Sequence, residues 1–179
     1  GASPPVPQLF LCPALPIQHL GFPIMTDDPL AYFMTWTCYG TWLPGDERGW
    51  TKWHKGEHIP QPLLADWSLR RMVDKPVVLN ETERAVVQET IKQHCELRGW
   101  HLHAVNCRSN HCHAVVTTVT HDGEQVRDQL KLWSTRKLKE HQRSVDGVKL
   151  REHWWTRKGS VRCLFDDESL EAAIIYTLE

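Results

Sequence analysis

Two alternating segments near the middle of the chain decide the fold: Trp100-His101-Leu102-His103-Ala104-Val105-Asn106-Cys107 and His111-Cys112-His113-Ala114-Val115-Val116-Thr117-Thr118-Val119. Both are rich in β-branched and apolar residues, which is typical of strands. The connection between them is short and suits a tight antiparallel turn. The sequence therefore predicts a β-hairpin over 100–119.

Other elements are predicted on either side of this hairpin. Residues 31–38 are aromatic and threonine-rich and predict a strand, and residues 160–165 predict another. Asn80-x-x-Glu83 resembles a capping box, apolar residues recur at 87, 91 and 95, and Gly99 ends that helix. A loop is expected over 40–62 and a short helix near 64–74. A long helix is expected over 123–143, where Val126, Leu130, Trp133 and Lys137 recur at helical spacing. The last helix is capped by Asp166 and carries one apolar stripe of Leu170, Ala173, Ile174 and Leu178.

The resulting order is strand, helix, strand, strand, helix, strand, helix. Antiparallel strands combined with helices in this order indicate an α+β protein. We predict a ferredoxin-like antiparallel sheet with the helices packed mainly on one face.

Composition and length indicate one globular domain of moderate size. The chain has 179 residues, of which 41% are hydrophobic, and it contains no apolar run long enough to cross a membrane. Residues 1–24 are proline-rich, begin with a Gly1-Ala2-Ser3 cloning scar and are expected to be an arm or linker, with the domain over 25–179. Six cysteines without CxxC spacing and the lack of a secretion signal predict a reduced, cytoplasmic protein.

The charge is distributed unevenly along the chain. The formal net charge is −1, but residues 127–162 hold eleven Lys and Arg against four acidic residues, a local net charge of +7. Such a segment either attracts an anionic ligand to one face or is simply solvated. The sequence leaves both interpretations open.

Histidines are the main candidates for chemistry. His111 and His113 stand at i and i+2 on a predicted strand, so both imidazoles face one side while Cys112 faces the other. Two neutral imidazoles can hold a divalent metal. His101 and His103 form a rival pair with the same spacing, and a zinc module of Cys107, His111, Cys112 and His113 is a further alternative.

Tyr176 is the candidate nucleophile in the last predicted helix. Helical geometry places it on the flank of the apolar stripe, beside Ala172, where it could reach past the core. A tyrosine can attack a phosphodiester next to a metal, although a packing residue at the boundary of the core is the plainer interpretation.

The combination of these motifs resembles the single-tyrosine HUH transposases, which include the REP-associated tyrosine transposases and their insertion-sequence relatives. The resemblance spans roughly residues 30–179. It is carried by 99–104 leading into Asn110-His111-Cys112-His113, and by 155–160 leading through Leu164-Phe165-Asp166 to Ile175-Tyr176.

The resemblance implies an enzyme that cuts and rejoins DNA. His111 and His113 would bind Mg²⁺ or Mn²⁺, Tyr176 would attack to leave a 5′-phosphotyrosine and a free 3′-OH, and His101 and His103 would be structural or DNA-contacting. The family also uses a third polar ligand about one turn after the tyrosine. That position falls beyond Glu179, so we expect either a truncated chain or a ligand from elsewhere.

The expected partner is single-stranded and hairpin DNA, with a homodimer left open and no membrane association. The basic residues expected to grip phosphates are Lys131, Arg136, Lys137, Lys139, Arg143, Arg157 and Lys158. Trp42, Trp50 and Trp53 in the 40–62 loop are a further DNA-contact hypothesis. The alternative function is a domesticated or inactive protein that binds DNA hairpins without cutting.

Overall fold

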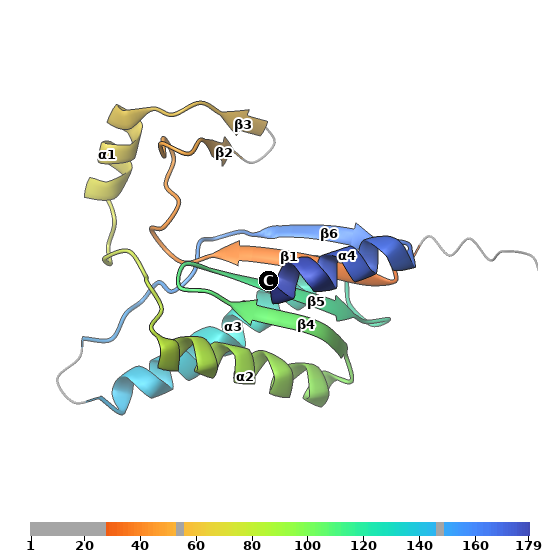
Figure 1. The fold of residues 1–179 in the computed structure, drawn as a ribbon. Coiled ribbons are helices and arrows are strands. Elements are labelled where there is room, and N and C mark those ends of the chain that lie inside the picture. Colours follow the sequence, from red (N-terminus) through yellow and green to blue (C-terminus); the bar gives the residue numbers. More distant parts are fainter. Residues whose placement is uncertain (1–27, 53–55, 146–148) are drawn as a thin grey trace, which may run out of the picture.

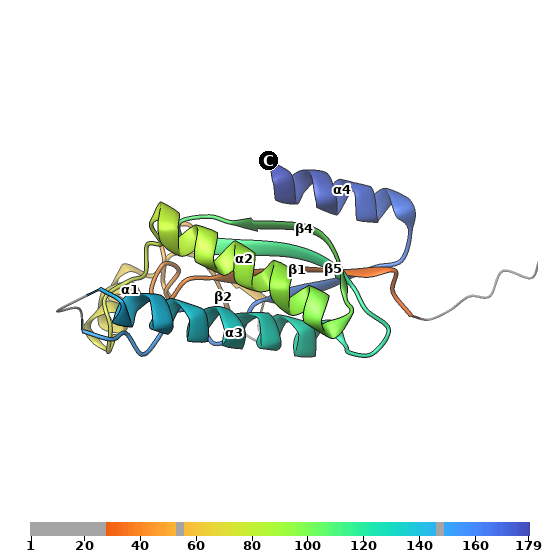
Figure 2. The same ribbon diagram turned by 90° about the horizontal axis from the view of Figure 1, so that it is seen from below.

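The computed structural model describes residues 28–52, 56–145 and 149–179, and it contains one four-stranded antiparallel sheet. The strands are β1 (Ala31–Thr37), β4 (His101–Cys107), β5 (His111–Thr117) and β6 (Ser160–Leu164), in the order β4-β5-β1-β6. Helices α2 (Glu81–Arg98) and α3 (Gly123–Arg143) cover one face, and α4 (Asp167–Leu178) lies on the other (Figures 1 and 2). The α+β, ferredoxin-like prediction is confirmed.

Capping residues set the ends of these helices much as the sequence predicts. The Asn80 side chain accepts a hydrogen bond from the Glu83 N–H, and Glu83 reciprocates, so α2 begins with a capping box. Gly99 ends α2 in the left-handed conformation at φ 66°, which favours glycine. The Asp122 and Asp166 side chains likewise accept a hydrogen bond from a backbone N–H in the first turn of α3 and α4.

Strand β5 is buried on both faces, so its side chains contribute to two separate cores. Cys112, Ala114 and Val116 face α2 and α3 in the larger core, with Met34 and Trp36 of β1 beside them. The alternate residue Val115 faces α4 in a smaller cluster. The members of that smaller cluster are Ala31, Ala104, Val115, Leu164 and Ala173.

The connection between β1 and α2 is more ordered than predicted. Residues 40–52 and 56–72, which we call the β1–α2 arm, contain β2 (Trp50–Lys52), β3 (Gly56–His58) and α1 (Pro62–Arg70). Strands β2 and β3 form a small antiparallel pair, where the sequence indicated only a loop. The strands are too short to show a period-2 pattern, and Pro62 starts α1 earlier than expected.

The buried stripe of α4 differs from the prediction at its end. Thr177 is fully buried, whereas Leu178, which the helical pattern assigned to the stripe, is exposed. Thr177 can be buried without leaving its hydroxyl unpaired, because this group donates to the Ala173 carbonyl at 2.8 Å.

The expected arm over residues 1–24 lies outside the described residues, and so does Cys12. The domain boundary at residue 25 therefore stays a prediction. Of the described cysteines, Cys163 is exposed and the other four are buried, all as free thiols. Within the described ranges, no helix has the length and apolar character needed to cross a membrane.

Removing the core contact of α2 should destabilise the whole domain. Ile91 is fully buried in the larger core, so Ile91→Ala should lower the free energy of unfolding by about 3 kcal/mol in urea titrations. Leu97→Ala on the same helix is the control, because Leu97 is 78% exposed; it should change stability by less than about 0.5 kcal/mol. Equal losses in both variants would contradict this arrangement of the core.

Candidate active site

The two histidines of the Asn110-His111-Cys112-His113 motif lie at the start of β5, on the face covered by α4. Their ring centroids are 4.7 Å apart. Cys112 between them points into the opposite core, as strand alternation predicts. Across β1, His111 pairs with Thr37 and His113 with Thr35, so the histidines sit in the interior of the sheet.

Helix α4 brings Tyr176 to this pair. The Tyr176 ring lies 5.3 Å from the His113 ring and 5.8 Å from Phe33, edge-on to both. Phe33 of β1 stacks on His113 at 5.7 Å. Tyr176 nevertheless remains 56% exposed, so one side of the residue packs while the rest faces solvent. The aromatic contacts therefore place a solvent-accessible tyrosine beside His113, whose ring neighbours also include His111.

Hydrogen bonds orient both imidazoles through the same ring atom. The Asn110 side-chain oxygen lies 2.6 Å from His111 Nδ1, and an amide oxygen can only accept, so Nδ1 carries the proton. Thr35 Oγ1 lies 2.8 Å from His113 Nδ1. In His111 the Nε2 lone pair is then available to a ligand, and the Thr35 contact allows the same tautomer in His113.

Burial keeps these histidines neutral. It lowers the pKa of His113 to about 4, with smaller contributions from the neighbouring His111 and Arg108. Burial also lowers the pKa of His111, again with Arg108 adding to the effect. At neutral pH both rings are therefore unprotonated, which is the form that binds a metal.

The donor set fits a divalent metal with several open positions. Two neutral imidazoles are competent ligands, and water or substrate oxygens can complete the coordination. Among the described residues, no group of three or more His, Cys, Asp or Glu side chains is placed to hold an ion. His111 and His113 offer two neutral nitrogen donors with adjacent rings.

The structure separates the two rival arrangements from this site. His101 pairs with Thr117 at the opposite end of β5, and His103 contacts the Thr117 hydroxyl at 2.8 Å beside a β-bulge. Cys107 and Cys112 belong to the core on the far side of the sheet, so a zinc module joining them to His111 and His113 is contradicted.

The predicted basic residues fall into two groups, one in the segment before β6 and one on α3. Arg157 and Lys158 are exposed in the segment before β6, next to Thr156, whose hydroxyl lies 3.1 Å from that of Thr37 beside His111. The others lie on α3, which covers the opposite face of the sheet from Tyr176 (Figure 2). These residues are Lys131, Arg136, Lys137, Lys139 and Arg143.

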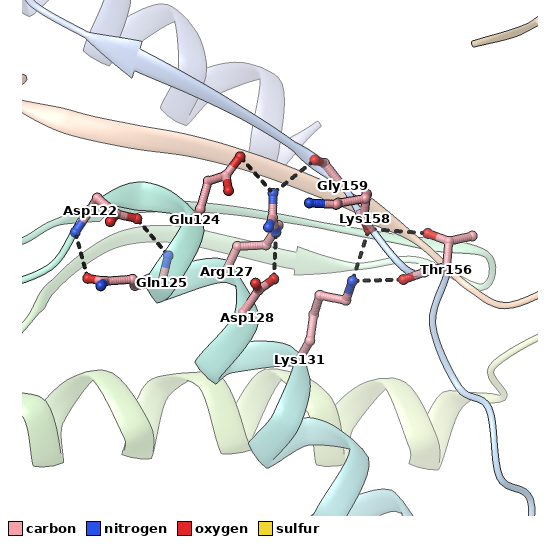
Figure 3. Close-up of polar contacts among 9 residues, drawn as sticks. All are labelled: Asp122, Glu124, Gln125, Arg127, Asp128, Lys131, Thr156, Lys158 and Gly159. Carbon is pink, nitrogen blue, oxygen red and sulfur yellow. Dashed lines mark hydrogen bonds and ion pairs between the residues drawn. The ribbon is translucent and has the colours of Figure 1, made fainter. Parts of the chain in front are cut away.

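Lys131 does not reach the surface, in contrast to the role expected for it. It is 8% exposed, and its Nζ donates to the carbonyls of Thr156 at 2.8 Å and Lys158 at 2.9 Å (Figure 3). Burial lowers the pKa of Lys131 to about 8. We therefore replace its expected phosphate contact by a structural one: Lys131 holds the 156–158 segment in place.

Arg127 has a parallel role one turn earlier on α3. It is almost fully buried, donates to the Gly159 carbonyl at 3.1 Å and pairs with Asp128 at 2.9 Å (Figure 3). The helical pattern assigned Lys137 to the packed stripe, but Lys137 is exposed and pairs with Glu140. Spacing along the helix could not identify Arg127 and Lys131 as buried, because their partners are backbone carbonyls of a distant segment.

Phe33 and Thr35 are site residues that the sequence analysis did not single out. They reach His113 through the register of β1 with β5, which pairs positions 78 residues apart. No local pattern encodes that register. Asn110 could have been found, because it immediately precedes His111 in the motif.

Comparison with known proteins places these features in a family. The family model described as transposase, IS200-like, matches residues 71–173, which is more than half of the chain. A comparison with curated proteins gave no match. Two solved structures are similar in fold: a REP-associated tyrosine transposase bound to a REP hairpin (11% identity, TM-score 0.47) and a proposed transposase from Deinococcus radiodurans (14% identity, TM-score 0.44).

These structural likenesses cover most of the chain. The likeness to the REP-associated transposase covers 84% of this chain and 65% of that chain. The likeness to the Deinococcus radiodurans protein covers 83% of this chain and 88% of that chain. The chain thus spans slightly less than two thirds of the hairpin-bound protein's length.

The neutral state of His113 predicts a pH-dependent stability. The unfolded chain takes up a proton on this ring below about pH 6.5, whereas the folded chain does so only near pH 4. The free energy of unfolding should therefore be intact above pH 6.5 and fall between 6.5 and 4. The contribution of His113 to this fall is on the order of 3 kcal/mol.

Urea titrations of metal-free protein across this pH range test the effect. His113→Gln should show a shallower decline than the wild type, whereas His101→Gln, on an exposed position of β4, should follow the wild type. The same slope for all three proteins would contradict a buried neutral His113.

The position of Lys131 predicts a stability effect in place of a DNA effect. Lys131→Ala leaves the Thr156 and Lys158 carbonyls without their charged donor and should lower the free energy of unfolding by about 2 kcal/mol. Arg143→Ala, at an exposed end of α3, is the control and should stay within about 0.5 kcal/mol of the wild type. A fully stable Lys131→Ala protein with weakened DNA binding would restore the original expectation.

Proposed function

The chain belongs to the IS200-like transposase family, and from that premise we propose that it cuts and rejoins single-stranded DNA near hairpins, with Tyr176 as the nucleophile. One observation supports this most: a half-exposed tyrosine on α4 lies 5.3 Å, ring to ring, from one of two adjacent neutral histidines. A nucleophile beside two metal-binding imidazoles suits phosphodiester cleavage.

The proposed cleavage exchanges one phosphate ester for another. The Tyr176 phenol oxygen attacks phosphorus and loses its proton, the bond from phosphorus to the 3′ oxygen breaks, and that oxygen takes up a proton. The products are a 5′-phosphotyrosine and a free 3′-OH. Attack by this 3′-OH, or by one from another strand, reverses the exchange and releases Tyr176, so joining needs no external energy source.

The metal of this reaction would be Mg²⁺ or Mn²⁺, held through His111 and His113. When bound, it supplies polarisation of the scissile phosphate and stabilises charge on its oxygens. Asn110 and Thr35 would keep the two rings in orientation through their Nδ1 contacts. Phe33 would support both His113 and Tyr176 from β1.

Basic residues would hold the DNA strand by its phosphates. Arg157 and Lys158 lie in the segment that contacts the end of β1 next to His111, so we assign them the phosphates nearest the cut. Exposed and half-buried residues on α3 would contact DNA that continues around the domain: Arg136, Lys137 and Arg143 are exposed, and Lys139 is half-buried. Binding through such contacts should weaken steeply as salt increases.

A covalent adduct assay tests the proposal. Incubated with Mn²⁺ and labelled single-stranded DNA carrying a hairpin from the flanks of its own gene, the wild type should form an adduct that survives a denaturing gel. Tyr176→Phe should abolish the adduct, and His111→Ala should reduce it at least 100-fold, because loss of the metal removes several kcal/mol of charge stabilisation. Tyr32→Phe is the matched control and should react normally, since Tyr32 packs against Gly123 of α3.

The outcome separates cutting from simple binding. An adduct that persists in Tyr176→Phe would overturn the assignment of the nucleophile. Intact hairpin binding with no adduct, also in a chain extended past Glu179, would favour a domesticated hairpin-binding protein. Activity that requires the extension would place a further metal ligand there.

A further inference from the structure

We propose that the β1–α2 arm binds unpaired bases of the DNA strand by stacking them on Trp42 and Trp67. The proposal rests on the proposed function and extends it to a surface for the single-stranded DNA beside the cut. The family match begins at residue 71, so both tryptophans lie outside the residues that the family model describes. The arm projects from the sheet as a separate feature (Figure 1).

The segments that flank the arm on either side both contact the turn next to the candidate active site. Where it leaves β1, the Cys38 N–H donates to the Asn110 carbonyl at 2.7 Å. Where the chain returns towards α2, the Leu79 N–H donates to the Ser109 carbonyl at 2.7 Å. Both contacts are to the turn that leads into His111. A strand that passes this end of β5 therefore has the arm as its neighbour.

Trp42 is held in a defined orientation with much of its surface uncovered. It is 47% exposed, and its indole N–H donates to the Gly49 carbonyl at 2.7 Å. The Arg48 guanidinium lies 5.2 Å from the ring centre and is itself fixed by Asp46 at 2.7 Å. Because ring and cation are already positioned, a base stacking on Trp42 would cost little side-chain entropy.

Trp67 repeats this arrangement on α1. It is 53% exposed, and the Arg71 guanidinium lies 4.2 Å from its ring centre. None of the residues of α1 is buried, so this helix presents its side chains outward. The neighbouring Ser68 hydroxyl donates to the Pro44 carbonyl at 3.4 Å, which ties α1 to the loop that carries Trp42. The two rings are thus carried by segments that contact each other.

The chemistry of this surface favours single-stranded DNA over a second copy of the chain. Unpaired bases stack on aromatic rings whatever their sequence, and arginines beside the rings attract the phosphates between them. A two-fold dimer with Trp67 at its axis would bring the Arg71 guanidinium groups of the two copies together, whereas Arg48 is already paired with Asp46 in each copy. The like-charge contact between the two Arg71 side chains opposes self-association through this ring.

Binding measured in EDTA tests the surface without any cleavage. Fluorescence anisotropy would compare a blunt DNA hairpin with the same hairpin carrying a single-stranded tail of about ten nucleotides, within the range that stacking grooves occupy. The wild type should bind the tailed hairpin more tightly. Trp42→Ala and Trp67→Ala should each weaken binding of the tailed hairpin about tenfold and leave the blunt hairpin unchanged. Trp67→Phe should retain most of the affinity, because it keeps a stacking ring.

Leu63→Ala is the matched control for α1. Leu63 is 89% exposed on the same helix but offers no aromatic ring, so this variant should bind both DNAs as the wild type does. Equal affinity of the wild type for blunt and tailed hairpins, or unchanged tail binding in both Trp→Ala variants, would overturn the proposal. So would a dimer in sedimentation that Trp67→Ala dissociates while tail binding stays intact.

The adduct assay separates failure of this proposal from failure of the proposed function. Normal Tyr176–DNA adducts with no contribution from the tail would reject the arm surface and leave the cleavage chemistry standing. A wild-type chain that bound neither hairpin would reject both.

Discussion

The site depends on one constraint: β5 is an interior strand with a packed layer on each face. Successive side chains of such a strand pack alternately into one layer and the other. A shift of the strand pairing by one residue would therefore move every side chain to the opposite layer. In this register Cys112 fills the large core and His113 faces α4. Burial then keeps the pKa of His113 low, and the Thr35 hydroxyl satisfies its Nδ1. A position that makes the imidazole hard to protonate also makes it suitable for a metal.

The face that carries the histidines is covered only lightly. The buried cluster between α4 and the sheet has five members, three of which are alanines, whereas the opposite core is larger and contains Trp36, Ile91 and Leu130. A helix held by a small apolar cluster is an element of low local stability. The rings of Phe33 and His113 therefore contribute a substantial part of what positions Tyr176, so the proposed nucleophile and metal ligand support each other directly.

Buried cations connect the two sides of the domain. Arg127 and Lys131 extend from α3 to backbone carbonyls of the segment before β6 (Figure 3). That segment contacts Thr37, which pairs with His111. Burying an ammonium is costly unless its donors are paired, and here the carbonyls of Thr156 and Lys158 pair them. The same contacts fix the backbone on which Arg157 and Lys158 are presented. The positive residues of α3 thus hold this segment in place and also contribute to the surface potential.

The sequence by itself determined what depends on local spacing. Caps at Asn80 and Asp166 and the alternation of the 100–119 hairpin define elements whose signals lie within a few residues, and His-x-His places two rings on one side of a strand. Only the tertiary structure decided which histidine pair meets Tyr176, because that depends on the pairing of β1 with β5 and on the side of the sheet that α4 covers. It also decided that Lys131 is buried, since a lysine's partners can be carbonyls that no sequence pattern marks. Local geometry is set by neighbours in the chain, whereas register, layer and burial are set by residues far away in it.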